Sequence, residues 1–148
     1  MKVREIMHSR AVSIGPGEPV IAAVLLMKRY NLGALPVCEG GRVKGMVTDR
    51  DILLRCVGAG MDLKATRVSE IMSRAVVSAD AEDSAEHAAA LMAARQLRRL
   101  PVTENGRLAG MVGLGDLARR EDCRALCAQT LGRISANISR AGPGDFPG

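Results

Sequence analysis

Hydrophobic and polar positions follow one pattern that occurs twice along the chain. A short apolar segment, at 11–14 and again at 76–79, leads to a longer apolar stretch at 20–30 or 85–95. The length and the apolar content of the two longer stretches predict helices. The chain therefore begins each half with the same two elements.

A hairpin and a second helix follow each predicted helix. The paired strands are expected at 35–39 with 43–47 and at 100–104 with 108–112. Gly40-Gly41 and Asn105-Gly106 lie between the strands and supply the positive φ angles of a tight turn. A second helix is expected to open near Asp49 in the first half and near Gly115 in the second.

The two halves are copies of one sequence. VREIM at Val3 aligns with VSEIM at Val68, an offset of 65 residues, and the alignment continues without a gap to Asp51 and Asp116. Because the apolar faces of one unit are too small to be stable alone, we expect the copies to pack against each other.

This repeat divides the chain into four parts. We expect a first repeat at 1–60, a linker at 61–67, a second repeat at 68–122, and a C-terminal helix extension with a flexible tail at 123–148. The helix after Asp116 is expected to continue through 119–131.

Composition limits the class of protein. The 148 residues are 47% hydrophobic, enough for a core of ordinary size, and the longest apolar run, at 21–27, is too short to cross a bilayer. We therefore expect a soluble, cytoplasmic protein. Four cysteines and two histidines are scattered without metal-ligand spacing, so no metal site is predicted.

The net charge of +5 favours polyanionic partners, either nucleic acid or a phosphorylated small molecule. Tyr30 and Phe146 are the only aromatic residues, so the chain cannot present a row of rings on which single-stranded nucleic acid stacks. A phosphorylated small molecule becomes the better candidate, and nucleic-acid binding stays an alternative.

One motif carries candidate chemistry. GMVTDRD at 45–51 returns as GMVGLGD at 110–116, each at the junction of a strand and a helix. Thr48 and Asp51 place a hydroxyl and a carboxylate that could hold the vicinal hydroxyls of a ribose, beside free amides that face a phosphate. The alternative interpretation is that Asp49 or Asp51 simply caps the helix.

The repeated order of motifs resembles the cystathionine-β-synthase (CBS) domain. The opening VREIM or VSEIM, the helix, the Leu-Pro-Val strand, the glycine-containing hairpin and the Gly-x-x-Thr-x-x-Asp loop recur over about residues 1–120, similar to a tandem CBS pair, or Bateman module. The resemblance implies an α+β fold of two β-α-β-β-α repeats packed with pseudo-twofold symmetry. It also implies a homodimer, and adenine nucleotides or adenosyl compounds bound in clefts between the repeats.

The resemblance implies two unequal clefts. The first would use Thr48 and Asp51 for a ribose and Arg98 with Arg99 for phosphate, unless these arginines are solvated surface charges. Its adenine pocket would comprise Val12, Ser13, Ala34, Leu35 and Pro36. Arg50 either contacts phosphate or is solvated.

The second cleft is expected to bind more weakly. It would use Ser78, Leu100, Pro101 and Asp116, but Gly113 replaces the hydroxyl and Gly33-Ala34 stand where the arginines would be. We therefore expect one strong site per chain.

Catalysis is not expected. Residues 113–118 fit the dinucleotide fingerprint GxGxxA, but the acidic residue needed about 20 positions later is missing. No Walker A motif and no histidine-centred triad occur. The sequence thus predicts a regulatory module without a catalytic cofactor, which binds AMP, ADP or ATP, or alternatively NAD or S-adenosylmethionine, and acts on an unidentified protein. A dimeric interaction scaffold with empty clefts is the other candidate.

Overall fold

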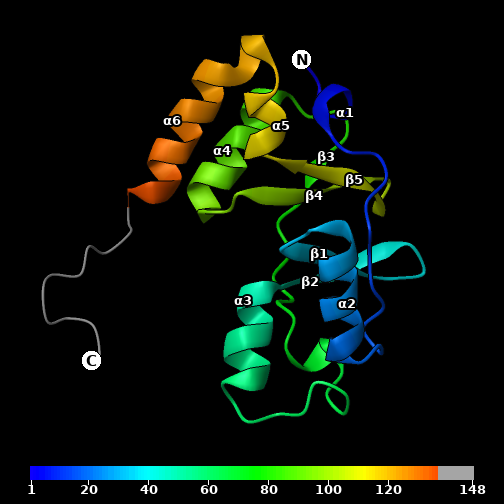
Figure 1. Ribbon diagram of the computed structural model, residues 1–148. Coiled ribbons are helices and arrows are strands. Elements are labelled where there is room, and N and C mark those ends of the chain that lie inside the picture. The colour runs from blue at the N-terminus through cyan, green and yellow to red at the C-terminus, as the bar shows by residue number, and fades with distance from the viewer. Residues whose placement is uncertain (137–148) are drawn as a thin grey trace, which may run out of the picture.

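The computed structural model describes residues 1–136, and each half contains a hairpin flanked by helices (Figure 1). The first half comprises α1 Val3–Ile6, α2 Val20–Tyr30, β1 Ala34–Glu39, β2 Arg42–Thr48, α3 Asp49–Asp51 and the π-helical turn η1 Ile52–Val57. The second comprises the 3-10 turn η2 Val68–Glu70, β3 Ala79–Asp80, α4 Ala85–Arg95, β4 Arg99–Glu104, β5 Arg107–Gly113, α5 Leu114–Ala118, the 3-10 turn η3 Glu121–Cys123 and α6 Arg124–Ser135. The expected α+β fold is confirmed.

Five strands form one sheet in the order β1-β2-β5-β4-β3. Each hairpin is antiparallel, and the hairpins meet where Arg42 of β2 pairs with Arg107 of β5. The turns have positive φ angles at Gly40-Gly41 and Asn105-Gly106, as the sequence predicts.

Two predicted elements differ from the structure. Residues 11–14 form no strand: Ile14 alone bridges to Val37, and β3 in the second repeat has two residues. The continuous helix expected after Asp116 is also wrong. Helix α5 ends at Ala118 because the extended backbone of Arg120 (φ −105°, ψ 125°) breaks it, and α6 turns back to pack on α4 and α5.

The opening segment of each repeat crosses to the other repeat. Val3 and Ile6 of α1 lie in the hydrophobic core of the second repeat, while Val68, Ile71 and Met72 lie in that of the first. The crossing is reciprocal, because the β-bridges come in pairs related by the repeat offset. His8 pairs with Met111 as Ser73 pairs with Met46, and Lys2 pairs with Ser84 as Arg67 pairs with Pro19. The pseudo-twofold arrangement of the two repeats therefore depends on this exchange of opening segments.

The glycine that opens each repeated motif makes room for this crossing. A Cβ atom at Gly45 would lie 2.7 Å from the carbonyl oxygen of Ser73, and one at Gly110 would overlap the carbonyl oxygen of His8. Since both obstacles are backbone atoms, neither can rotate away. The glycine of Gly-Met-Val is therefore explained in both copies by packing.

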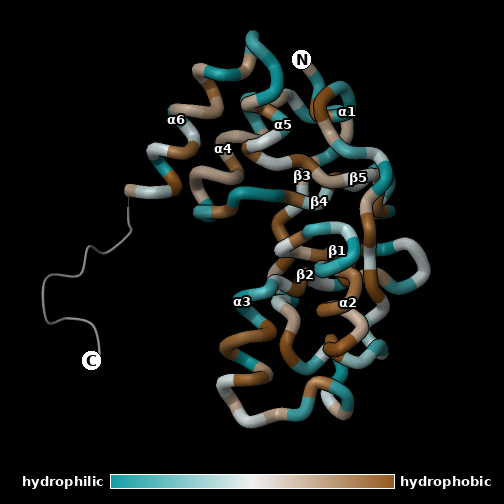
Figure 2. Tube along the Cα trace, viewed as in Figure 1, coloured by the Kyte–Doolittle hydropathy of each residue, from teal (hydrophilic) through white to brown (hydrophobic). Residues whose placement is uncertain are grey.

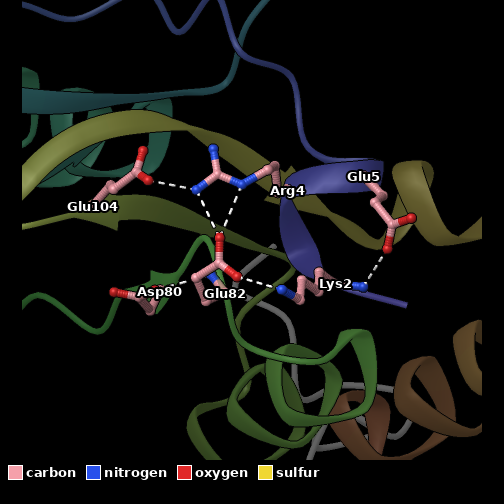
Figure 3. A network of polar contacts seen from close by, with 6 residues as sticks. All are labelled: Lys2, Arg4, Glu5, Asp80, Glu82 and Glu104. Atoms are coloured by element: carbon pink, nitrogen blue, oxygen red, sulfur yellow. Dashed lines mark hydrogen bonds and ion pairs between the residues drawn. The ribbon is translucent and has the colours of Figure 1, made fainter.

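Ion pairs fasten the first opening segment to the second repeat (Figure 3). Lys2 Nζ lies 2.6 Å from Glu82 Oε2, and Arg4 Nη2 lies 2.9 Å from Glu82 Oε1 and 2.5 Å from Glu104 Oε1. The hydrogen bond from Lys2 is the main cause that lowers the pKa of Glu82. Because all four side chains are exposed, these pairs add specificity more than stability.

Apolar residues concentrate between the sheet and the helices (Figure 2), but several large apolar side chains are exposed. The turns after α3 expose Leu53, Leu54 and Val57, and Leu25 of α2 is also exposed. In the second repeat, α6 covers the corresponding helices α4 and α5. In the described part of the chain, no helix is both long and apolar enough to span a bilayer.

Candidate functional site

A cavity of about 620 Å³ lies between the two repeats. The first repeat supplies the segment 7–12 and residues around the start of β1. The second supplies the start of β4, the end of β5 and the start of α5. Its lining comprises Met7, His8, Ser9, Arg10, Ala11, Val12, Tyr30, Leu32, Ala34, Pro36, Arg99, Met111, Val112, Gly113, Gly115, Asp116 and Arg119. Because the opening segment crosses over, both repeats are needed to form it.

Asp116 is the buried carboxylate of this cavity, with 7% of its surface exposed. Its Oδ2 atom accepts a hydrogen bond of 2.7 Å from the Gly113 N–H at the start of α5. Its Oδ1 atom accepts one from the Arg119 guanidinium, three residues further along, and lies 2.8 Å from His8 Nε2. Both carboxylate oxygens are thus occupied by groups of the chain itself.

Asp51, the equivalent residue of the first repeat, lies in a reciprocal helix cap. The Thr48 N–H donates to Asp51 Oδ2 (2.9 Å), and the Asp51 N–H donates to the Thr48 hydroxyl (3.0 Å). Arg55 Nε lies 3.7 Å from Asp51 Oδ1. The capping role that the sequence offers as the alternative is therefore present, and it leaves the Thr48 O–H free to donate.

The exchange of Thr48 for Gly113 is coupled to an exchange on the neighbouring strand. Arg99 faces Gly113 in the second hairpin, where Ala34 faces Thr48 in the first. A Cβ atom at Gly113 would lie 3.0 Å from Arg99 Cγ and 3.0 Å from the Arg98 carbonyl oxygen. The missing hydroxyl of the second copy thus makes room for an arginine at the cavity wall.

The structure brings five of the residues predicted from sequence to this cavity but regroups them. Val12, Ala34, Pro36 and Arg99, predicted for the cleft of Asp51, lie instead with Asp116. The others lie outside its lining: Ser13, Leu35, Thr48, Arg50, Asp51, Ser78, Arg98, Leu100 and Pro101. Leu35 and Leu100 are fully buried in the two cores. Ser13 instead lies beside Cys38, whose thiol pKa is raised by burial and lowered to a smaller extent by Ser13.

The lining residues that the sequence prediction did not include comprise the polar side chains of His8, Arg10, Tyr30 and Arg119 among others. Arg119 could have been found from its spacing, because it lies one helical turn beyond Asp116. His8, Arg10 and Tyr30 carried no such signal, since their place depends on the crossing of the opening segment.

Positive charge predominates in the cavity. Arg10, Arg99 and Arg119 line it, against the single carboxylate of Asp116. Within residues 1–136, no carboxylate lies within ion-pair distance of Arg10 or Arg99. These two guanidinium groups are available to an anionic ligand. The same residues contain no group of three His, Cys, Asp or Glu side chains that could hold a metal ion.

Comparison with known sequences identifies relatives across most of the chain. The sequence model of the CBS domain matches residues 3–58 and 68–122. CBS domain-containing protein YhcV of Bacillus subtilis is 42% identical over 137 residues, which cover 93% of this chain and 94% of YhcV. Hypoxic response protein 1 of Mycobacterium tuberculosis is 35% identical over 117 residues, which cover 78% of this chain and 82% of that protein.

Solved structures agree with the sequence relatives. The crystal structure of Hypoxic Response Protein I with two coordinated zinc ions matches with a TM-score of 0.76 and 34% identity, over 81% of this chain and 98% of that one. The CBS domain pair of protein MJ0100, in complex with 5-methylthioadenosine and S-adenosyl-L-methionine, matches with a TM-score of 0.72 and 22% identity, over 80% and 94% of the two chains. The crossed repeats, the shared cavity and these relatives lead to one conclusion: the chain belongs to the CBS domain family and carries two CBS domains in tandem.

Proposed function

We propose that the chain is a regulatory module that binds an adenosyl ligand in the cavity between its repeats. The observation that carries this proposal is the lining of the cavity, which combines an apolar wall, a buried carboxylate and unpaired arginines. The adenosyl ligands of the MJ0100 domain pair support the ligand class by analogy of fold.

The lining suits the parts of a nucleoside. Val12 and Pro36 offer apolar surface to a base, and Tyr30 contributes an aromatic ring. Asp116 and the Gly113 N–H lie at the other side, where a ribose would place its hydroxyl groups. We therefore place the base against the first repeat and the sugar against the second.

We also propose a second binding position, formed by the residues of the other predicted cleft. Thr48, Asp51 and Arg50 would contact a ligand there, with Ser13, Leu35 and Arg98 close by. Ser78 is proposed as an outer contact of the Asp116 position, whereas Leu100 and Pro101 are buried and contact no ligand directly. Of the two positions, the one at Asp116 is expected to bind the ligand strongly.

Regulation requires that the ligand bind one arrangement of the protein better than another. Because both repeats line the cavity, a ligand would hold them in one relative position and so change the affinity for a partner. We propose that one such partner is a second copy of the chain, with the exposed Leu53, Leu54 and Val57 as the surface it covers.

A thermal-shift screen with AMP, ADP, ATP, NAD and S-adenosylmethionine tests the function. A ligand present at a hundred times its dissociation constant adds about 2.7 kcal/mol of stability. Gly115→Leu is the matched control, since a Cβ there meets no atom within 4 Å and the larger side chain would fill the cavity without disturbing the core. A shift in the wild type that Gly115→Leu removes supports the proposal.

One observation favours the alternative function, a dimeric scaffold with empty clefts. Asp116 is already saturated by Arg119 and His8, and apolar side chains are exposed on the first repeat. The absence of any shift with the five compounds, together with dimerisation, would favour the scaffold and contradict ligand sensing.

A further inference from the structure

Arg119 and His8 hold the carboxylate that a ribose would need. The Arg119 guanidinium contacts Asp116 Oδ1, and His8 Nε2 lies 2.8 Å from the same oxygen and 2.8 Å from Arg119 Nη2. Asp116 is buried, whereas the side chains of Arg119 and His8 are 63% and 65% exposed. The side chains of Arg119 and His8 therefore cover Asp116 from the solvent side.

Opening this contact leaves a guanidinium without its partner beside a buried carboxylate. A buried charge that loses its partner is costly, and a sugar hydroxyl, which is neutral, compensates only part of the loss. A ligand that carries both groups compensates both partners, because its sugar hydroxyls donate to Asp116 and its phosphate accepts two parallel hydrogen bonds from Arg119. The arrangement thus favours a ligand that brings its own negative charge.

Two further arginines are placed to receive that charge. Arg99 and Arg10 line the same cavity and make no ion pair within the described residues. Arg99 can occupy this position because residue 113 is glycine; a side chain at 113 would crowd Arg99. A cationic group, such as the sulfonium of S-adenosylmethionine, would face three arginines and one occupied carboxylate.

We propose that the cavity selects a phosphorylated ligand, and that Arg119 exchanges Asp116 for a ligand phosphate and so releases Asp116 to the sugar hydroxyls. This inference rests on the proposed function and narrows its ligand class. It applies to one cleft only, because the positions equivalent to Arg119 and His8 in the other are Leu54 and Ser73.

Calorimetric titration tests the exchange with four probes: adenosine, ATP, S-adenosylmethionine and inorganic tripolyphosphate. The wild type is expected to bind ATP at least about tenfold more tightly than adenosine or S-adenosylmethionine. Arg99→Ala is expected to weaken the affinity for ATP about tenfold to a hundredfold, the usual effect of losing a charged hydrogen bond. The affinity for adenosine should stay unchanged.

Arg119→Ala gives the result that a merely structural role would not. This substitution weakens the binding of ATP but strengthens the binding of adenosine. Asp116 is then available to the sugar hydroxyls without first breaking its contact with Arg119. Arg120→Ala is the control: its side chain lies 3.4 Å from Asp122 and outside the cavity lining, so all four affinities stay unchanged.

The outcomes separate this inference from the proposed function. Equal affinities for ATP and adenosine in the wild type, or equal losses of both affinities in Arg119→Ala, would overturn the proposed selection of a phosphorylated ligand. The proposed adenosyl-binding site would still be supported. Binding of tripolyphosphate that depends on Arg99, without binding of any adenosyl compound, overturns the function and upholds the phosphate site. If none of the four probes binds, both are overturned.

Discussion

The pair of Gly113 and Arg99 shows how one residue exchange reshapes a site. The same space between paired β-strands is filled differently in the two hairpins. In the first, Thr48 lies opposite Ala34 and supplies a hydroxyl; in the second, Gly113 lies opposite Arg99, which supplies a guanidinium. From the sequence alone, glycine at 113 looks like the loss of a ligand contact. In the structure it is the condition for another contact.

Gly113→Thr is therefore expected to destabilise the protein. The new Cβ would press on Arg99 Cγ and on the Arg98 carbonyl oxygen, both at 3.0 Å, and such overpacking costs about 1–3 kcal/mol. The double variant Gly113→Thr with Arg99→Ala restores the pair found in the first repeat and should recover part of this loss. Urea unfolding of the wild type, both single variants and the double variant measures the coupling, and strict additivity would contradict it.

Gly110→Ala and Gly115→Ala are expected to have opposite effects on stability. At 110 the methyl group overlaps the His8 carbonyl oxygen, so the free energy of unfolding should fall by about 1–3 kcal/mol or more. At 115, inside α5, the methyl group meets no atom within 4 Å and removes backbone freedom, which should add up to about 1 kcal/mol. Equal effects in thermal unfolding would show that the opening segment does not cross at Gly110.

The opening segments are the elements whose placement matters most for the fold. Ile6 is buried in the core of the second repeat and Ile71 in the core of the first. Each repeat is thus completed by the other, and the linker takes part as well: the Ile21 N–H donates to Leu63 O and the Val20 N–H to Thr66 O, at the start of α2.

This exchange predicts where the effect of a core substitution appears. Truncation of a buried isoleucine to alanine costs about 2–5 kcal/mol. Ile6→Ala should raise amide hydrogen exchange chiefly in β4 and β5, and Ile71→Ala chiefly in β1 and β2. If each substitution instead loosened the hairpin of its own repeat, the crossed arrangement would be wrong.

The sequence predicts local elements better than the relation between them. Helices α2 and α4 and both hairpins follow from apolar spacing and from turn residues, which act over a few positions. The repeat offset reveals two copies, but it carries no information on which copy receives each opening segment. The break at Arg120 was also missed, because residues 117–123 contain no proline or glycine to mark the end of a helix.

At the scale of the molecule, the two repeats have equivalent folds and unequal surroundings. Asp116 and Arg99 could be chosen from sequence because they lie in aligned motifs, but the sequence placed Arg99 in the other cleft, with Thr48 and Asp51. His8, Arg10 and Tyr30 come to the cavity only through tertiary packing, so the charge of the site could not be counted beforehand. The sequence therefore favours the Thr48 position, whereas the described cavity lies at Asp116.

The helical face of the first repeat yields a prediction about assembly. Leu53 and Leu54 are 61% and 52% exposed, and replacing both with glutamate would place two charges on the proposed surface between copies. We expect this variant to shift sedimentation from dimer to monomer. Leu131→Glu on α6, where the leucine is 41% exposed, is the control and should leave the dimer intact. The same shift in both variants, or in neither, would contradict this surface.

The central claim is that one ligand binds per chain, in the cavity that contains Asp116. Calorimetric titration of ATP into Gly115→Leu and Arg50→Leu tests it most directly, because these variants put the same side chain at equivalent positions of the two clefts. We predict one site per chain in the wild type and in Arg50→Leu, and loss of binding in Gly115→Leu. Two equal sites in the wild type, or loss of binding in Arg50→Leu alone, would contradict the account.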